Sequence, residues 1–402
     1  MEIINDQISV KQMIECWPQT KSVFIHFGFK KLLEPEVIEK LGPFLKVHTL
    51  LKHNNISQSA FLKICNAEVH TVPEMFSPDI IKSKPTFLGL LPCGLKVSLD
   101  RAIESFAAHQ RSNGNGFDYL VEGNVNHELS YYQYVDSVDS VDELPDLILS
   151  SDLNSFFHHR FLNRFVNPGG FVSVNTTMNS LFTGIGYSDP RGNFTMFSAN
   201  VLVIVHVHDT CTKVVQPQSW KELTNDIYRK SVIMRGQDDF FCSGVLIPYF
   251  KLYGVDSIKR LAGSVCGGMH PSQMVKMIDS GAKDIAPLYI MPWFFAKKIK
   301  LQDRINIIFP EEGGFISPVQ ILVKKLKYHQ LSKITDYLLS EEMQQHCANN
   351  FFPSFHTKIT NNLPAGKKIY WIGWDFIYGN DLGRIKKSIG ELFTYEYSKS
   401  GK

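Results

Sequence analysis

Apolar residues near the N-terminus recur at the spacing of short amphipathic helices. Ser9 precedes Val10, Met13 and Ile14, a pattern in which a serine N-cap opens a helix with one apolar face. Short helical patterns of this kind continue to about residue 68. The sequence therefore predicts a small all-α unit over residues 1–68.

The hydrophobic pattern changes after this unit. Residues 68–85 contain three prolines and show no clear period, and we interpret residues 69–82 as a linker. Beyond the linker, strand-like apolar runs alternate with amphipathic helical stretches, which predicts an α/β fold with mainly parallel sheets. The expected strands lie within residues 86–92, 144–151, 197–208, 231–236, 284–292 and 305–315. The expected helices lie within residues 98–110, 152–165, 219–230, 244–254 and 270–281.

Composition and charge narrow the class of protein. A chain of 402 residues with 44% hydrophobic and 20% charged residues is typical of a globular protein with two or three domains. The net charge of +3 comes without a long basic run, so nucleic acid is not an expected partner. No apolar run approaches the ~18–20 residues that a membrane span needs, so no span is expected.

The N-terminal residues bear on the expected location. The segment carries an acidic residue at position 2 and lacks an apolar core, so it does not have the pattern of a secretory signal. We therefore expect a cytoplasmic protein. A periplasmic or cell-surface location would follow if the native start lay upstream.

The seven cysteines are odd in number and scattered, without a Cys-x-x-Cys pair. This spacing argues against a disulfide framework or a zinc ribbon and favours reduced thiols. Neither a Walker motif nor a Rossmann fingerprint is present, and Cys242 lies in no Gly-x-Ser-x-Gly elbow. We therefore expect no cofactor and no enzymatic activity.

The order of segments in the α/β part resembles that of type 2 periplasmic binding proteins, in the group that imports ferric iron and aminoethylphosphonate. A Pro-x-Ser-Trp-Lys-Glu-Leu motif, a Pro-Glu-x-Gly turn and a later Ser-Glu-x-x-Gln helix are fairly specific in combination. The resembling segments are residues 87–106, 144–157, 216–236, 270–295, 309–325 and 334–353. The helical unit resembles a small domain of unknown function that is fused to other bacterial domains.

This resemblance implies two α/β lobes joined by a hinge, preceded by the all-α domain. Lobe one would comprise residues 83–200 and 315–402, and lobe two would comprise residues 201–314 with the hinge crossings. Ligands of such folds bind in the crevice at the carboxyl ends of strands, held by loops and helix N-termini. The implied partners are a small-molecule or ion ligand, an importer's membrane component, or a cytoplasmic protein bound through the helical domain.

The first candidate site loops follow the two strands of lobe one. Pro92 and Cys93 come directly after the first strand, where Cys93 either contacts ligand or belongs to a tight turn. Ser150, Ser151 and Asp152 end the next strand. Asp152 is also suited to cap the following helix, a role compatible with ligand contact.

In lobe two, the stretch RGQDDFFCSG joins a strand to a helix that is expected to begin near Ser243. A helix N-terminus favours an anion, so Ser243 and Gly244, with Cys242 beside them, suit a negatively charged ligand. Asp239 in the same loop favours a cationic or neutral ligand, or indicates a structural cap. The charge of the ligand therefore stays open.

The remaining candidates lie further along lobe two. His270 and Ser272 flank a helix start, where His270 contacts ligand or faces solvent. The ferric-binding relatives use adjacent tyrosines in the region of Tyr289, but only one tyrosine is present here, so iron ligation by tyrosinate is not expected. Trp293 offers an aromatic wall for an organic ligand, and Glu312 contacts a cation or lies in a solvated turn.

Three functions are compatible with these residues. The first is a solute-binding protein that closes around a small ligand by hinge motion, acting in the cytoplasm as a carrier or sensor. The second is a cytoplasmic enzyme that reuses the same two-lobed fold. The third is a metal-binding protein, with Cys93, Cys242 and His270 as weak candidate ligands.

Overall fold

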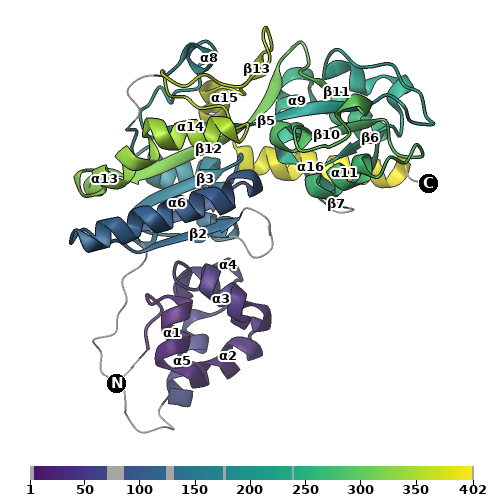
Figure 1. Cartoon of the computed structure of the whole chain (residues 1–402). Coiled ribbons are helices and arrows are strands. Elements are labelled where there is room, and N and C mark those ends of the chain that lie inside the picture. Colours follow the sequence, from purple (N-terminus) through teal and green to yellow (C-terminus); the bar gives the residue numbers. More distant parts are fainter. Residues whose placement is uncertain (1–3, 70–85, 124–130, 175–177, 238–239, 401–402) are drawn as a thin grey trace.

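The computed structural model describes residues 4–69, 86–123, 131–174, 178–237 and 240–400. Apart from Val69, the linker expected at residues 69–82 lies outside this described part. The described chain forms a helical domain and a larger α/β domain, and the helical domain lies against one end of the larger one (Figure 1).

The helical domain is built as the apolar spacing predicts. Ser9 caps the first helix, because its Oγ accepts from the backbone N of Gln12 at 3.1 Å while the Gln12 side chain accepts from the backbone N of Ser9 at 3.0 Å. Phe24 and Phe61 meet edge to face in the buried centre, with ring centroids 5.2 Å apart. The helices are α1 Val10–Cys16, α2 Lys21–His26, α3 Pro35–Leu41, α4 Val47–His53 and α5 Gln58–Val69.

The α/β domain is organised around one large mixed sheet with the strand order β2-β1-β3-β12-β5-β10-β6-β9. The strands are parallel at both ends of this sheet, whereas β12 and β5 pair antiparallel with each other and with β3 and β10. The expectation of mainly parallel sheets is therefore wrong. The strands are β1 Phe87–Leu91, β2 Tyr119–Gly123, β3 Leu147–Ser151, β4 Phe171–Val172, β5 Thr195–Val207, β6 Val232–Met234, β9 Val265–Gly268, β10 Leu288–Pro292, β11 Ile305–Ile308, β12 Gly314–Lys324 and β13 Ile369–Tyr370.

The α/β domain has two lobes, each with its own group of helices (Figure 1). In the first lobe, β1, β2 and β3 are accompanied by α6 Cys93–Ser112, α13 Tyr328–Leu338 and α14 Glu341–Asn349. In the second lobe, β6, β9 and β10 are accompanied by α9 Ser243–Tyr253, α10 Val255–Ser264, α11 Pro271–Asp279 and α12 Trp293–Ala296. The two-lobed fold expected from the sequence is thus confirmed.

Strands β5 and β12 join the two lobes. Their thirteen and eleven residues are almost all buried, as expected for strands covered on both faces. They pair in antiparallel register, with Ser317 opposite Asn200, and the register shifts between Val319 and Gln320. One continuous, buried pair of strands therefore connects the two lobes.

One expected helix begins later than predicted, and another is replaced by shorter turns. In residues 152–165, Asp152 has a positive φ of 74° and Asn154 caps a 3-10 turn by accepting from the backbone N of Phe156 at 2.9 Å. Short side-chain bonds of this type compete with helix formation. The helix therefore does not begin at Asp152 but at His159, where α7 His159–Phe161 continues into a π-helical turn, Leu162–Val166. Residues 219–230 likewise form two 3-10 turns, which are separated by the extended residue Asn225.

The last helix, α16 Leu382–Ser400, packs against α9 and α10 of the second lobe. This helix lies within residues 315–402, which the resemblance assigns to lobe one. At its start, Gly383 faces His158 of the first lobe so closely that an added Cβ would lie 3.0 Å from the imidazole ring. The helix therefore bridges the two lobes.

Within the described residues, none of the helices has both the length and the apolar character required to cross a membrane.

The stacking of Phe315 on Trp220 predicts that removal of the Phe315 ring lowers the stability of the protein measurably. Phe315 of β12 is fully buried and stacks on Trp220, with ring centroids 4.1 Å apart. We expect Phe315→Ala to lower the free energy of unfolding by about 3–5 kcal/mol, because it removes a large buried ring and leaves a cavity. Denaturant titration followed by tryptophan fluorescence measures the change. Leu326→Ala, at a side chain that is 93% exposed, is the matched control and is expected to change stability by less than about 0.5 kcal/mol. A similar loss in both variants would contradict the packing argument.

Candidate ligand-binding site

A small cavity of about 40 Å³ lies where β5 and β12 cross between the lobes. Its walls come from residues that directly follow β1, β3, β6 and β10, at the carboxyl ends of these strands, where open α/β sheets bind ligands. The lining residues are Pro92, Cys93, Ser151, Asp152, Asn200, Arg235, His270, Pro271, Pro292, Phe294, Phe295 and Ser317. Both lobes thus contribute to one site.

Asp152 lies at the centre of the polar side of this cavity. Its backbone N donates to the carbonyl of Pro318 at 2.8 Å, and its Oδ1 accepts from Ser317 Oγ at 3.0 Å and from the backbone N of Leu153 at 3.0 Å. A positive φ is strained for a residue other than glycine, and such strain persists only where surrounding contacts enforce it. Strand β12 therefore fixes this carboxylate in place.

Arg235 of the second lobe faces Asp152, with its Nη1 3.8 Å from Asp152 Oδ2. Lys386 of α16 is not part of the cavity lining but is electrostatically coupled to the same groups. Burial lowers the pKa of Lys386, and Arg235 lowers it further, while Asp152 and Cys242 act in the opposite direction. The lining itself therefore holds one cation, Arg235, beside one carboxylate.

The N-terminus of α9 lies behind this charge cluster. Cys242 precedes the first helical residue, and its side chain makes no capping hydrogen bond. A Cβ added to Gly244 would lie 3.4 Å from Asp152 Oδ1, so the first turn of the helix is in contact with the carboxylate. Burial raises the pKa of the Cys242 thiol, and Asp152 raises it further, so this thiol stays protonated at neutral pH. Cys242, Ser243 and Gly244 thus adjoin the cavity without being part of its lining.

His270 has a structural role as well as a place in the wall. His270 is the N-cap of α11, because its Nδ1 accepts from the backbone N of Ser272 at 3.2 Å. The same Nδ1 lies 2.7 Å from Ser272 Oγ. An accepting Nδ1 leaves the proton on Nε2. Burial lowers the pKa of His270, and Arg235 lowers it further. Ser272 therefore orients His270 and does not itself line the cavity.

Aromatic residues after β10 form the apolar wall. Phe294 and Phe295 line the cavity, and their ring centroids are 4.2 Å apart. Trp293 packs instead against Phe309 and Phe351 and is 2% exposed. The hydroxyl of Tyr289 is buried and finds no hydrogen-bond partner within the described residues. The structure therefore places Trp293 and Tyr289 in the core, away from the cavity lining.

Two further sequence candidates, Ser150 and Glu312, do not line the cavity. Ser150 Oγ is buried 3.0 Å from the side-chain amide of Gln320. Glu312 accepts from the backbone N of Trp220 at 3.1 Å and from the hydroxyl of Tyr253, so it fastens the segment before β12. Asp239 lies outside the described residues.

The weak metal candidates do not assemble into a ligand set. Cys93 and His270 line the cavity, whereas Cys242 is buried at the start of α9. In the part of the chain that the structure describes, no three His, Cys, Asp or Glu side chains form a group that could hold a metal ion.

Comparison with known proteins now assigns the fold to a family. Residues 142–380, more than half of the chain, match the family of bacterial extracellular solute-binding proteins. The chain belongs to this family. No curated protein sequence matches this solute-binding protein.

Solved structures with the same fold include three at low sequence identity. A ferric binding protein from Campylobacter jejuni shares 12% identity over 78% of this chain and 98% of its own, with a TM-score of 0.51. The periplasmic binding protein P5PA shares 11% identity over 77% and 98%, with a TM-score of 0.53. A two-component system protein that mediates signal transduction shares 14% identity over 76% and 99%, also with a TM-score of 0.53. At these identities the likeness establishes the fold alone.

Sequence reasoning missed four polar residues of the site. Arg235 directly follows β6, but the expected strand 231–236 ran past it, so the rule applied to Asp152 did not find it. Asn200 and Ser317 lie inside β5 and β12, and they line the cavity because this strand pair passes from one lobe to the other there. Lys386 carries no local signal, since its helix is far along the chain from every other residue of the site.

The environment of His270 predicts a lowered pKa of its imidazole. We expect its pKa to lie below the ordinary value of about 6.5, because burial and Arg235 both disfavour the imidazolium. Its protonation therefore favours the unfolded chain as the pH falls through that value. NMR titration of the imidazole measures the pKa, and Arg235→Gln is expected to raise it toward the ordinary value. Arg229→Gln, which replaces an exposed arginine of the same lobe, is the control. An unshifted pKa that is insensitive to Arg235 would contradict the placement of these groups.

Proposed function

We propose that this solute-binding protein captures a small anionic solute in the cavity between its lobes. The observation that supports this proposal is Arg235 in the cavity wall beside the single carboxylate of Asp152, with the Lys386 side chain electrostatically coupled to both. Arginine offers a planar fork of donors that matches carboxylate and phosphate oxygens, and the N-terminus of α9 adds its dipole. A ligand oxyanion would pair with Arg235 and would favour the protonated form of Lys386.

The carboxylate of Asp152 is compatible with an anionic ligand. Its Oδ1 already accepts two hydrogen bonds, and Arg235 lies close to its Oδ2. Much of its negative charge is therefore directed toward the protein. Asn200 and Ser317 add neutral polar groups that can select among oxyanions, and Phe294 and Phe295 provide an apolar wall for the remainder of the solute.

The size of the cavity fits capture by lobe closure. About 40 Å³ accommodates a group the size of a few atoms, far below the ~300–1,000 Å³ of an ordinary ligand pocket. We infer that the lobes separate about β5 and β12 to admit solute and close around its charged group, the hinge motion typical of such binding proteins.

A bare metal cation receives less support from these residues. The Campylobacter jejuni protein is a ferric binding protein. In this chain, Arg235 lines the cavity and would repel a metal ion, unless the metal arrived as an anionic complex.

An importer's membrane component, a protein partner of the helical domain and a cytoplasmic location stay predictions from the sequence. The domain boundaries at residues 68, 82, 200 and 314 have the same status. None of them is required for capture of an anion.

Binding measurements test the charge of the solute. The purified chain would be titrated by calorimetry and thermal shift with phosphate, sulfate, methylphosphonate, acetate, glutamate, ferric citrate and spermidine. We expect binding of at least one oxyanion, and Arg235→Gln and Lys386→Gln are each expected to weaken it by about 10- to 100-fold, since a hydrogen bond to a charged group contributes about 1.5–3 kcal/mol.

Arg229→Gln is the matched control, because it removes the same charge from the second lobe away from the cavity. It should leave the affinity within about twofold of the unaltered chain, as expected for a distant exposed charge. Binding of spermidine alone, or anion binding that survives both cavity substitutions, would refute an anion site at this place.

A further inference from the structure

The helical domain rests on one segment of the first lobe, residues 131–143, which we call the docking segment. Three 3-10 turns make up this segment, namely Tyr131–Gln133, Val135–Ser137 and Val141–Glu143. Two aromatic contacts reach it from the helical domain. Phe44 lies 5.9 Å from Tyr131, and His53 lies 5.1 Å from Tyr134, measured between ring centroids. These rings give the contact its apolar part.

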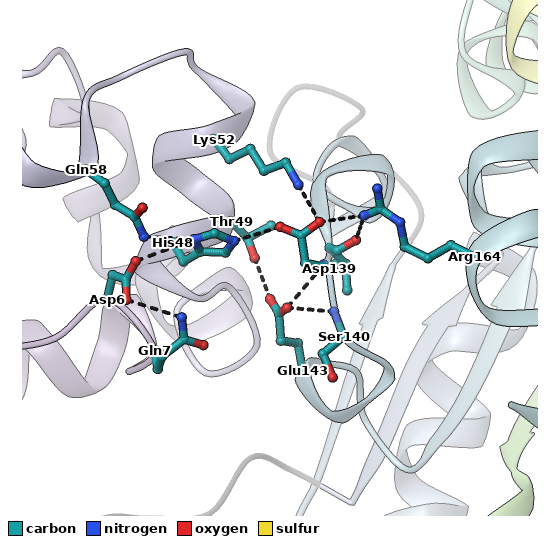
Figure 2. Close-up of polar contacts among 11 residues, drawn as sticks. Asp6, Gln7, His48, Thr49, Lys52, Gln58, Asp139, Ser140, Glu143 and Arg164 are labelled. Carbon is teal, nitrogen blue, oxygen red and sulfur yellow. Dashed lines mark hydrogen bonds and ion pairs between the residues drawn. The ribbon is translucent and has the colours of Figure 1, made fainter.

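Asp139 holds the polar part of the contact together (Figure 2). From α4 of the helical domain, Lys52 Nζ donates to its Oδ1 and His48 Nε2 lies 2.8 Å from its Oδ2. From the first lobe, Arg164 Nη1 donates to Oδ1 at 2.7 Å. Burial alone would raise the pKa of Asp139, but Lys52, His48 and Arg164 together lower it to about 2. One carboxylate thus joins cationic groups of both domains.

Glu143 provides a second, buried connection. Its Oε2 accepts from Thr49 Oγ1 of α4 at 2.7 Å. Its Oε1 accepts from the backbone N of Asp139 at 3.1 Å and of Ser140 at 2.9 Å. Hydrogen bonds within the docking segment therefore help to hold the carboxylates of Asp139 and Glu143 toward α4. This is the arrangement of a built recognition surface, with charges aligned against a complementary helix.

The opposite side of the docking segment leads toward the cavity. Asp136 Oδ2 lies 2.7 Å from His158 Nδ1, and Gly383 at the start of α16 lies against the imidazole of His158. Lys386 follows Gly383 by three residues, so the two lie on the same face of α16. A continuous set of contacts therefore runs from the helical domain through the docking segment and His158 to the first turn of α16, the helix that carries Lys386.

We propose that the helical domain is a built-in regulatory partner of the first lobe, whose docking through Asp139 holds α16 in place and thereby restrains opening of the cavity. A charged contact of this kind is reversible, because screening by salt weakens it. The helical domain stays tethered after release, so that re-docking is intramolecular and favourable. The functional effect at the cavity rests on the proposed function, whereas docking of the helical domain on the first lobe is independent of it.

The test compares full-length chains without any ligand. Hydrogen exchange would follow the backbone amides of α4 and of the docking segment, and alkylation by iodoacetamide would follow Cys242, a buried thiol beside the cavity at the start of α9. We expect Asp139→Asn to speed exchange in both segments and to raise the alkylation rate of Cys242 by roughly fivefold or more, the scale of an ordinary allosteric coupling. Cys211, exposed elsewhere on the chain, should react at an unchanged rate.

Asp336→Asn is the matched control, since it makes the same substitution at an exposed residue of α13 in the first lobe. Lys52→Gln removes the partner of Asp139 from the helical domain and should reproduce the effect of Asp139→Asn, and the double variant should add little to either. Circular dichroism checks that each variant is folded.

Each outcome decides the matter. Exchange in Asp139→Asn and Lys52→Gln at the rates of the unaltered chain would overturn docking through Asp139. Faster exchange with an unchanged Cys242 rate would overturn control of the cavity. Because neither readout requires an anion, failure of the anion titration would refute the proposed function and leave this inference standing.

Discussion

The antiparallel pairing of β5 with β12 is the constraint on which the rest of the α/β domain depends. Each strand runs through both lobes, and their pairing is unbroken from Phe315 opposite Leu202 to Ile321 opposite Thr195, apart from one shift of register. The parallel strands of both lobes flank this pair, and their carboxyl ends meet beside it. The position of the site therefore follows from the sheet topology rather than from any one motif.

Burial of charge at this position needs compensation. A carboxylate held at a strained backbone angle is maintained only by contacts from several directions, and Asp152 receives them from β12, from its own turn and from Arg235. Lys386 is electrostatically coupled to this carboxylate as well, and burial lowers the pKa of its ammonium. A ligand carrying negative charge would pair with Arg235 and favour protonation of Lys386, so the charges around the cavity, rather than its shape, point to an anion.

The sequence predicted those features that arise from local pattern. Ser9 as a helix cap, the strand before Pro92 and the helix start at Ser243 all follow from residue spacing, and the structure has each of them. The helix expected from Asp152 failed, because Asp152 and Asn154 bond to nearby backbone groups and the phenylalanines that follow are buried on all sides. Lys386 and the crossing residue Ser317 could not be found by pattern, since their place depends on contacts between segments more than one hundred residues apart.

The same non-local geometry gives α16 its importance. A helix that packed on one lobe would move with that lobe, but α16 lies on α9 and α10 while its first turn abuts His158 of the first lobe. Relative motion of the lobes must therefore change the contact between Gly383 and His158, or the position of Lys386, or both. Asp136 fixes His158 from the docking segment, which the helical domain holds from its other side. Docking of the helical domain and the position of α16 are thus energetically coupled, because both depend on contacts made by the docking segment.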